Sequence, residues 1–183
     1  NKANLKEYSN YAIKKAKLVK KSLIVDIGSN DGTCLTNFKN RNMNVLGIDP
    51  AKKPCQIANK KGIKSINGFF NKKISRKILR EYGEVDFVTS HNTLAHVDDI
   101  KSIFENIFFI LKKNGYFCFE IGYFKEVIKN NYFDTIYHEH LDYHHANPLV
   151  KFLKKIGFSV VDISVVNIQG GSLRLLCKKD LKK

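Results

Sequence analysis

The stretch SLIVDIGSNDG, residues 22–32, decides the fold because an apolar run rich in β-branched residues leads directly into two glycines. Such a run predicts a buried strand, and Gly28 and Gly32 predict a tight turn into a helix over residues 33–40. A second apolar run, residues 44–50, follows that helix. Strand, helix and strand in this order predict two parallel strands joined by a crossover helix.

The same alternation continues along the rest of the chain. Further strands are expected over 64–70, 85–92 and 115–123, and further helices near 54–61, over 72–82, from about 98 to 112 and over 148–156. Two final strands, 158–167 and 171–179, are separated by glycines, which is typical of an antiparallel hairpin. The pattern predicts an α/β fold with a Rossmann-like, doubly wound, mostly parallel seven-stranded sheet that ends in this hairpin. Amphipathic residues 5–19 are expected either to form a helix that caps the body or to be the end of a preceding element.

Size and composition indicate a single domain. With 183 residues and 43% hydrophobic content, residues 1–183 are enough for one core but hardly for two. No run approaches twenty apolar residues and the polar start is unlike a signal peptide, so we expect a cytoplasmic protein without a membrane partner. The four cysteines lack C-x-x-C spacing, which predicts reduced thiols and neither a disulfide framework nor a zinc knuckle.

The formal net charge of +15 indicates an anionic partner. The lysines are spread over the whole length and arginines are few, so a specific nucleic-acid surface is not expected. The pattern favours a lysine-rich, solvated surface.

Polar residues gather where the predicted strands end, and ligands of open α/β sheets bind there, near the point where strand order reverses. Asp49 ends the second strand, 23 residues after Asp26, where an acid can accept both hydroxyls of a ribose. Asp31 would repel the pyrophosphate of a dinucleotide but would tolerate a sulfonium or an ammonium group. These features predict S-adenosylmethionine as the cofactor; alternatively, the glycines only form a tight turn and Asp49 caps a loop. The residues expected to bind the cofactor are Asp26, Gly28, Ser29, Asn30, Gly32, Asp49, Pro50, Gly68, Phe69 and Asn92.

Four of the six histidines lie in the stretch FDTIYHEHLDYHH, residues 133–145. Zinc could be bound by His138 and His140 with His144 or His145, although no cysteine is near and nothing marks a fourth ligand. A half-buried structural cluster is a second interpretation. Acid–base chemistry is the third and is favoured, because imidazole titrates near neutral pH.

A second polar stretch, SHNTLAHVDD, follows the strand over residues 85–92. Its His91, Asn92 and His96 are therefore expected at the same sheet edge as the glycine turn. His96 is either a polar residue at a helix entry or a proton-handling or hydrogen-bonding group beside the methyl donor.

Several motifs taken together resemble the sugar C-methyltransferases, which add a methyl group to C3 of a nucleotide-linked 4-keto-deoxysugar. The motifs are DIGSNDG, GIDPA, the GFF of residues 68–70, NTLAHVDD, FDTIYHEHL and the final GGSLR. The resemblance implies a class I methyltransferase fold, S-adenosylmethionine as cofactor and a nucleotide-linked keto-sugar as substrate. It also implies that His140 is the catalytic base, with Tyr137 and Glu139 beside it and His96 in the site. This chemistry requires no metal.

Full-length members of that family resemble a three-part protein, with a cysteine-rich zinc module before this region and a further α/β module after it. The present chain resembles the central module alone. Two other functions stay open, a methyltransferase acting on an oxygen or nitrogen of a small metabolite, and a non-catalytic S-adenosylmethionine-binding module that needs partner domains. A nucleic-acid methyltransferase is a further alternative that only the charge supports.

Overall fold

A computed structural model describes residues 2–132, 142–167 and 171–180 of the chain. The strands are β1 (Leu23–Ile27), β2 (Asn44–Asp49), β3 (Ser65–Asn67), β4 (Val85–His91), β5 (Leu111–Gly122), β6 (Phe158–Val166) and β7 (Ser172–Lys179). The helices are α1 (Lys2–Ala16), α2 (Thr33–Lys39), α3 (Lys52–Lys60), α4 (Lys72–Tyr82), α5 (Ile100–Ile110), α6 (Phe124–Lys129) and α7 (Ala146–Ile156), with the 3-10 turn η1 (Leu94–His96).

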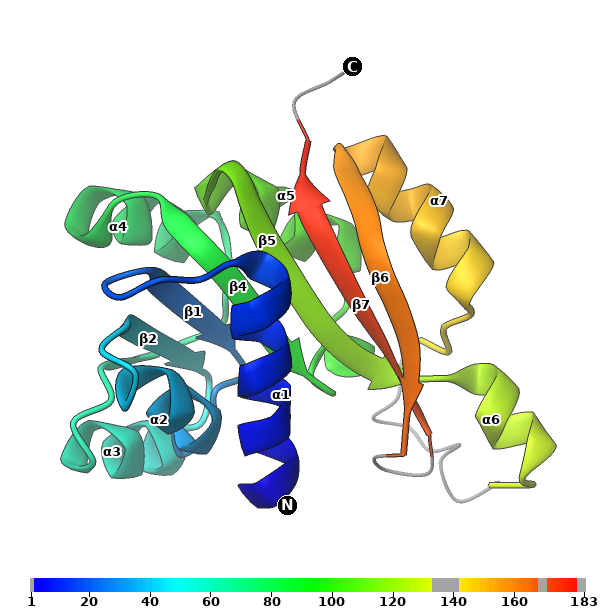
Figure 1. Ribbon diagram of the computed structural model, residues 1–183, viewed down its shortest axis with the longest axis horizontal. Helices are drawn as coiled ribbons and strands as arrows, with labels where there is room; N and C mark the ends of the chain where they lie inside the picture. The colour runs from blue at the N-terminus through cyan, green and yellow to red at the C-terminus, as the bar shows by residue number, and fades with distance from the viewer. Residues whose placement is uncertain (1, 133–141, 168–170, 181–183) are drawn as a thin grey trace.

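These strands form one sheet in the order β3-β2-β1-β4-β5-β7-β6 (Figure 1). Strands β1 to β5 pair in parallel, and β7 pairs antiparallel with both β5 and β6. Strand order therefore reverses between β1 and β4, and the hairpin places its second strand beside β5. The predicted α/β fold, a doubly wound and mostly parallel seven-stranded sheet with a terminal antiparallel hairpin, is confirmed.

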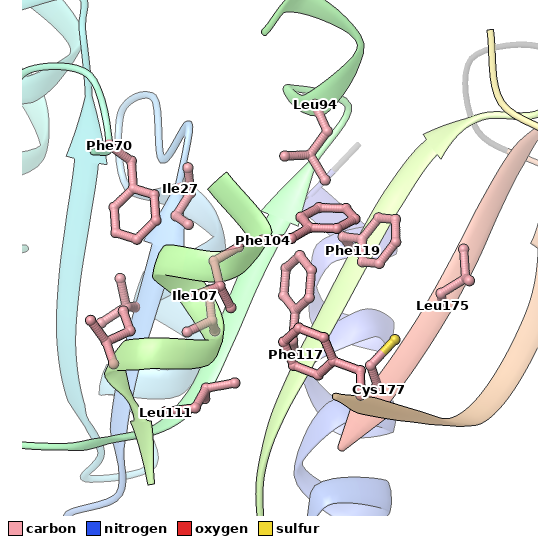
Figure 2. Packing of buried hydrophobic residues seen from close by; sticks show 14 of the residues in the cluster. Ile27, Phe70, Leu94, Phe104, Ile107, Leu111, Phe117, Phe119, Leu175 and Cys177 are labelled. Atoms are coloured by element: carbon pink, nitrogen blue, oxygen red, sulfur yellow. The ribbon is translucent and has the colours of Figure 1, made fainter. Parts of the chain in front are cut away.

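Helices cover both faces of the sheet, with α1, α2 and α3 on one face and α4, α5 and α7 on the other. Figure 2 shows the core on the second face, where Phe104 of α5 packs against Phe117 and Phe119 of β5, with ring centroids 5.4 and 5.3 Å apart. Because side chains alternate along a strand, Cys118 and Glu120 point to the face that α1 covers. The side chains of that face form the functional site described below.

The differences from the sequence prediction have local causes. The sequence predicts a strand over 64–70, but β3 ends at Asn67, because Gly68 has a φ of 158° and Phe70 is buried in the core. The helix predicted to about residue 112 ends at Ile110, because Leu111 already has an extended backbone. The sequence does not predict α6 or η1, since both are too short to show a helical period.

Candidate active site

A pocket of about 390 Å³ lies at the carboxyl ends of β1 and β4, where strand order reverses. Residues of the β1–α2 loop, the start of α2, the ends of β4 and β5, and the first turns of α1 line it. The described lining residues include three acids and one histidine but no lysine or arginine, in a chain with a net charge of +15. The pocket is therefore electrostatically suited to a cation. Its lining residues are Asn4, Leu5, Tyr8, Asp26, Gly28, Ser29, Asn30, Asp31, Thr33, Cys34, His91, Asn92 and Glu120.

The β1–α2 loop turns tightly because three of its residues have left-handed backbone conformations. Gly28, Asn30 and Gly32 have φ values of 75°, 49° and 75°. Glycine adopts this region without strain, and asparagine tolerates it better than most side chains do. At Gly28 a Cβ would also meet Oγ1 of Thr93 at 2.0 Å, so packing as well as conformation requires a glycine there.

Asp26 of β1 is buried, and the residue is 1% exposed and lines the pocket. Among the residues that the structure describes, its Oδ1 has no hydrogen-bond partner. Burial raises the pKa of Asp26 to about 7, against the opposing effect of nearby His91. A buried carboxyl group that lacks a partner gains most from a cationic hydrogen-bond donor, such as an ammonium group. Oγ of Ser29, in the β1–α2 loop, is a second buried atom for which the described residues supply no partner.

A row of polar side chains crosses three neighbouring strands at the pocket. His91 of β4 lies opposite Glu120 of β5, which lies opposite Arg174 of β7. Glu120 is 2% exposed and contacts Nδ1 of His91 at 2.9 Å and two nitrogens of Arg174 at 2.8 and 2.6 Å. Burial alone would raise the pKa of Glu120, but the bonds to His91 and Arg174 outweigh it and hold this pKa below its usual value. The row therefore keeps an ionised carboxylate at the pocket.

Helix α1 is attached to this row by buried contacts. Tyr8 is 1% exposed, its hydroxyl lies 2.5 Å from Oγ1 of Thr89, and its ring meets His91 edge-on with centroids 4.4 Å apart. The guanidinium of Arg174 lies 5.1 Å from the ring centroids of both Tyr8 and Tyr11. Figure 1 shows α1 lying across the sheet at this place. Polar contacts thus help to position the helix that supplies one wall of the pocket.

Sequence reasoning does not single out Glu120, Arg174 or Tyr8 as site residues. The available signal is an acid inside the apolar strand GYFCFEIGY, because a buried carboxylate needs a cationic partner. Arg174 lies in the GGSLR motif, to which no residue role is assigned. Tyr8 has no comparable signal, since its contacts depend on how α1 docks.

Asp49 lies at the end of β2 and outside the pocket lining. It is 7% exposed, and its two carboxylate oxygens accept the backbone N–H groups of Asn30 and Ala51, each at 2.8 Å. Asp49 therefore caps the loop, as the alternative interpretation of the sequence supposes. Each oxygen still has lone-pair capacity for a ribose hydroxyl, so the two interpretations are compatible.

The other predicted cofactor residues lie either near the pocket or near Asp49 at the end of β2. Asn92 lines the pocket, and Gly32 is buried at the start of α2. Gly68 donates its backbone N–H to the carbonyl of Asp49 at 2.9 Å. Pro50 and Phe69 are exposed beside it, the Phe69 side chain to 74%.

Of the four predicted catalytic residues, His96 is the one that falls within the described ranges. It is exposed at the end of η1 and is not among the residues that line the pocket. Tyr137, Glu139 and His140 lie outside the described residues. Their predicted roles therefore stay predictions.

His144, from the histidine-rich stretch, lies at the same sheet edge as the pocket. It forms a parallel bridge with Tyr123, directly after β5. Its Nε2 is buried and has no hydrogen-bond partner in the described part of the chain, and burial lowers the pKa of the imidazole. His144 therefore brings a neutral-favouring imidazole to the edge of the sheet where the pocket lies.

Cysteine and histidine side chains form no metal-binding group in the ranges 2–132, 142–167 and 171–180, where no cluster of three or more His, Cys, Asp or Glu could hold a metal ion. The four cysteines are free and buried, and burial raises the pKa of the Cys34 thiol well above its usual value. None of the described helices is both long and apolar enough to cross a membrane.

The strand order, with a pocket at the switch point, is typical of the class I methyltransferase fold. Residues 3–163 match the family described as methyltransferase domain. The chain belongs to this family, and the predicted cofactor, S-adenosylmethionine, is confirmed as that of the enzyme class.

Individual relatives agree with this assignment. C-methyltransferase NovU of Streptomyces niveus is 33% identical over 151 residues, which are 82% of this chain and 36% of that protein. The chain thus spans little more than a third of that relative. In fold it is similar to a putative methyltransferase of Haloferax volcanii solved with the Trm112 activator, with a TM-score of 0.75 at 15% identity over 96% of this chain and 89% of the other. It is also similar to magnesium protoporphyrin IX methyltransferase of Synechocystis, with a TM-score of 0.73 at 12% identity over 98% and 83%.

The residues present fit this cofactor. S-adenosylmethionine carries a sulfonium and an ammonium group and no phosphate. The unpaired Oδ1 of Asp26 and the acidic lining suit such cations. The lining described here has no lysine or arginine that would favour a pyrophosphate.

Proposed function

We propose that the chain is the catalytic module of a C-methyltransferase that acts at the carbon next to the carbonyl of a nucleotide-linked keto-deoxysugar. The 33% identity over 151 residues with a protein named as a C-methyltransferase carries this proposal. The motifs FDTIYHEHL and GGSLR support a sugar substrate through the family resemblance. Because the chain spans 36% of that relative, we take residues 1–183 to be one domain that works with further modules.

The cofactor residues divide by chemistry. Asp26 accepts a hydrogen bond from the ammonium group in this proposal, since no described residue donates to its buried Oδ1. Asp49 accepts a ribose hydroxyl with its remaining lone pairs. The other proposed cofactor contacts come from the glycine loop, the β2 and β3 ends and the end of β4: Gly28, Ser29, Asn30, Gly32, Pro50, Gly68, Phe69 and Asn92.

The proposed reaction begins with removal of a proton from carbon. A hydrogen beside a carbonyl is a far weaker acid than imidazolium, so the enolate must be stabilised as it forms. We assign His140 as the base; its ring nitrogen takes the proton and later releases it to solvent. Tyr137 or His96 donates a hydrogen bond to the developing oxyanion, and Glu139 orients an imidazole or binds a sugar hydroxyl. When bound, S-adenosylmethionine supplies an electrophilic methyl group, so a C–C bond forms as the S–C bond breaks.

Methyl transfer from ¹³C-labelled S-adenosylmethionine to a nucleotide-linked 4-keto-deoxysugar tests the proposal, with phenols and amines as rival acceptors. The label is expected on carbon, where carbon NMR distinguishes it from an O- or N-methyl group. His140→Asn should lower the transfer rate by about 10² to 10⁴. Its affinity for S-adenosylhomocysteine, measured by calorimetry, should stay close to that of the parent. Label on oxygen or nitrogen would instead favour a small-molecule O- or N-methyltransferase.

One observation favours a second candidate, a cofactor-binding module that turns over only with partner domains. The chain covers 36% of its C-methyltransferase relative, so much of that protein has no counterpart here. This candidate predicts binding of S-adenosylhomocysteine without turnover. Adding the flanking regions of the relative in trans should then restore methyl transfer.

A further inference from the structure

Most of the net charge of the chain comes from one segment. Residues 50–80 contain ten lysines and arginines and no aspartate or glutamate, whereas the rest of the chain has 22 basic and 17 acidic residues. This segment therefore carries ten of the fifteen net positive charges. We call its basic side chains the basic edge; they are Lys52, Lys53, Lys60, Lys61, Lys64, Lys72, Lys73, Arg76, Lys77 and Arg80.

The basic edge surrounds the β3 end of the sheet. Strand β3 is the terminal strand, with α3 on the face that carries α1 and α2, and α4 on the opposite face (Figure 1). All ten basic side chains are exposed. Ion pairs join Lys61 to Asp31 at 2.5 Å and Arg80 to Glu81 at 3.1 Å. The end of the sheet thus presents a strongly positive surface that acidic neighbours compensate only in small part.

Helix α4 concentrates half of these charges on one side. At 100° per residue, its five basic residues fall within an arc of about 140° over a length of about 12 Å. Its other side is packed in the core, where Ser75 and Ile78 are buried. The basic side of α4 is therefore held rigidly outward by the fold.

We propose that the basic edge docks on the surface of an anionic lipid bilayer. A bilayer presents many laterally mobile negative head groups, and each nearby lysine or arginine adds to the attraction. Eight of the ten basic residues are lysines, which act as hydrated point charges, whereas nucleic-acid recognition favours the planar fork of arginine. The two helices lie on opposite faces of the sheet, so their charges diverge around its end. A single nucleic-acid strand would need a groove on which the charges converge.

This proposal revises the expectation that the protein has no membrane partner. That expectation follows from the lack of a long apolar run and from a polar start unlike a signal peptide. A long apolar run is needed to span a bilayer, but attraction to a charged bilayer surface does not need one. Lysines occur along the whole chain, but residues 50–80 contain no aspartate or glutamate. This absence of acids identifies the basic edge.

Co-sedimentation with vesicles tests the docking surface. The chain is expected to bind vesicles of about 30% phosphatidylglycerol in phosphatidylcholine, not vesicles of phosphatidylcholine alone, and to dissociate as salt screens the charges. The fourfold variant K72Q/K73Q/R76Q/K77Q should lower the partition coefficient on the order of 10²- to 10³-fold, at about a factor of five per charge. Its affinity for S-adenosylhomocysteine should be unchanged, which shows that the fold is intact.

A matched variant removes the same net charge at the other end of the sheet. Lys125, Lys129, Lys151 and Lys154 are exposed on α6 and α7, and their replacement by Gln should lower the partition coefficient less than about fivefold. If the partition coefficients of the two variants fell equally, the overall charge of the chain would explain vesicle binding without a particular surface. That result would overturn the proposal. An unchanged partition of the α4 variant would do the same. So would a failure to bind the anionic vesicles, whether or not the chain binds a DNA duplex.

Discussion

The pocket contains buried acids, whereas the basic edge consists of exposed cations. At the pocket, Glu120 is 2% exposed and contacts both His91 and Arg174, and Asp26 is 1% exposed. At the basic edge, ten cations are exposed to water. The net charge of +15 therefore describes the outside of the molecule and says little about the site, whose lining is acidic. Charges that are buried should have large effects on the free energy of unfolding, and exposed charges should have small ones.

Glu120→Gln should have the largest effect on stability. The substitution keeps the shape of the side chain but leaves the guanidinium of Arg174, whose side chain is 11% exposed, without its counter-charge. Breaking a buried pair from one side lowers the free energy of unfolding by about 3–5 kcal/mol. Urea denaturation measures this loss. Glu105→Gln, which breaks the exposed pair with Lys101, is the control and should cost less than about 0.5 kcal/mol.

The pH dependence of the same variant provides a second check. The pKa of Glu120 is lower in the folded protein than in the unfolded chain, so its contribution is present above about pH 4 and is lost as the pH falls further. The Gln variant should therefore lose stability less steeply on acidification than the parent does. A variant whose free energy of unfolding lies within 1 kcal/mol of the parent would show that Glu120 does not differ from a surface acid.

Asp26→Asn should produce two effects of opposite sign. The pKa of Asp26 is raised to about 7, so the unfolded chain releases the proton at lower pH than the folded protein does. The free energy of unfolding of the parent should consequently fall as the pH rises from about 4 to 7. Asn removes this dependence and should raise the free energy of unfolding at pH 8 by roughly 2–4 kcal/mol.

The second effect of Asp26→Asn concerns the cofactor. Loss of a charge-assisted hydrogen bond should weaken S-adenosylmethionine binding by about 10- to 100-fold, as measured by calorimetry. Increased stability with reduced affinity would identify a carboxylate kept for function at a cost in folding. A variant that is destabilised at pH 8 would contradict this interpretation of the buried oxygen.

The sequence allows the fold to be predicted because the strand and helix patterns are local. Each apolar run and its following helix can be recognised separately, and Gly28 and Gly32 mark the turn between the first pair. The right-handedness of crossover connections then limits the strand orders that are possible, but the order itself is read from the structure. The boundaries near Asn67 and Leu111 were less predictable, since single backbone conformations decide them.

The site was predictable only in part, because local sequence patterns indicate its loop residues but not its long-range contacts. Residues 28–31 of the β1–α2 loop and Asn92 line the pocket at the ends of β1 and β4, and the strand-end rule places them at that edge. The contact between Glu120 and Arg174 depends on the register of β5 with β7, 54 residues apart in the chain. Tyr8 reaches Thr89 only once α1 has docked. No local pattern encodes such long-range contacts.

Tyr8→Phe should have an intermediate effect, because it removes a neutral buried hydrogen bond and no charge. The ring contacts with His91 and Arg174 are kept, and Oγ1 of Thr89 retains its contact with Nε2 of His91 at 3.1 Å. The free energy of unfolding should fall by about 1–2 kcal/mol. Tyr11→Phe, on the same helix but half-buried, should cost less. If both variants lower the free energy of unfolding by the same amount, burial does not make the Tyr8–Thr89 hydrogen bond more stabilising than a half-buried one.

The fourfold variant of α4, K72Q/K73Q/R76Q/K77Q, should have the smallest effect on stability. The four side chains are exposed, and Gln has nearly the helix propensity of Lys and Arg. Lys72 and Lys73 lie in the first turn of α4, where cations oppose the helix dipole, so their removal should raise the free energy of unfolding by about 0.5 kcal/mol at low salt. This gain should vanish at about 0.5 M salt, because exposed charges are screened. If the free energy of unfolding fell by more than about 1.5 kcal/mol, these four cations would contribute to the stability of the fold. The basic edge would then not differ from the buried row of His91, Glu120 and Arg174 in its importance for stability.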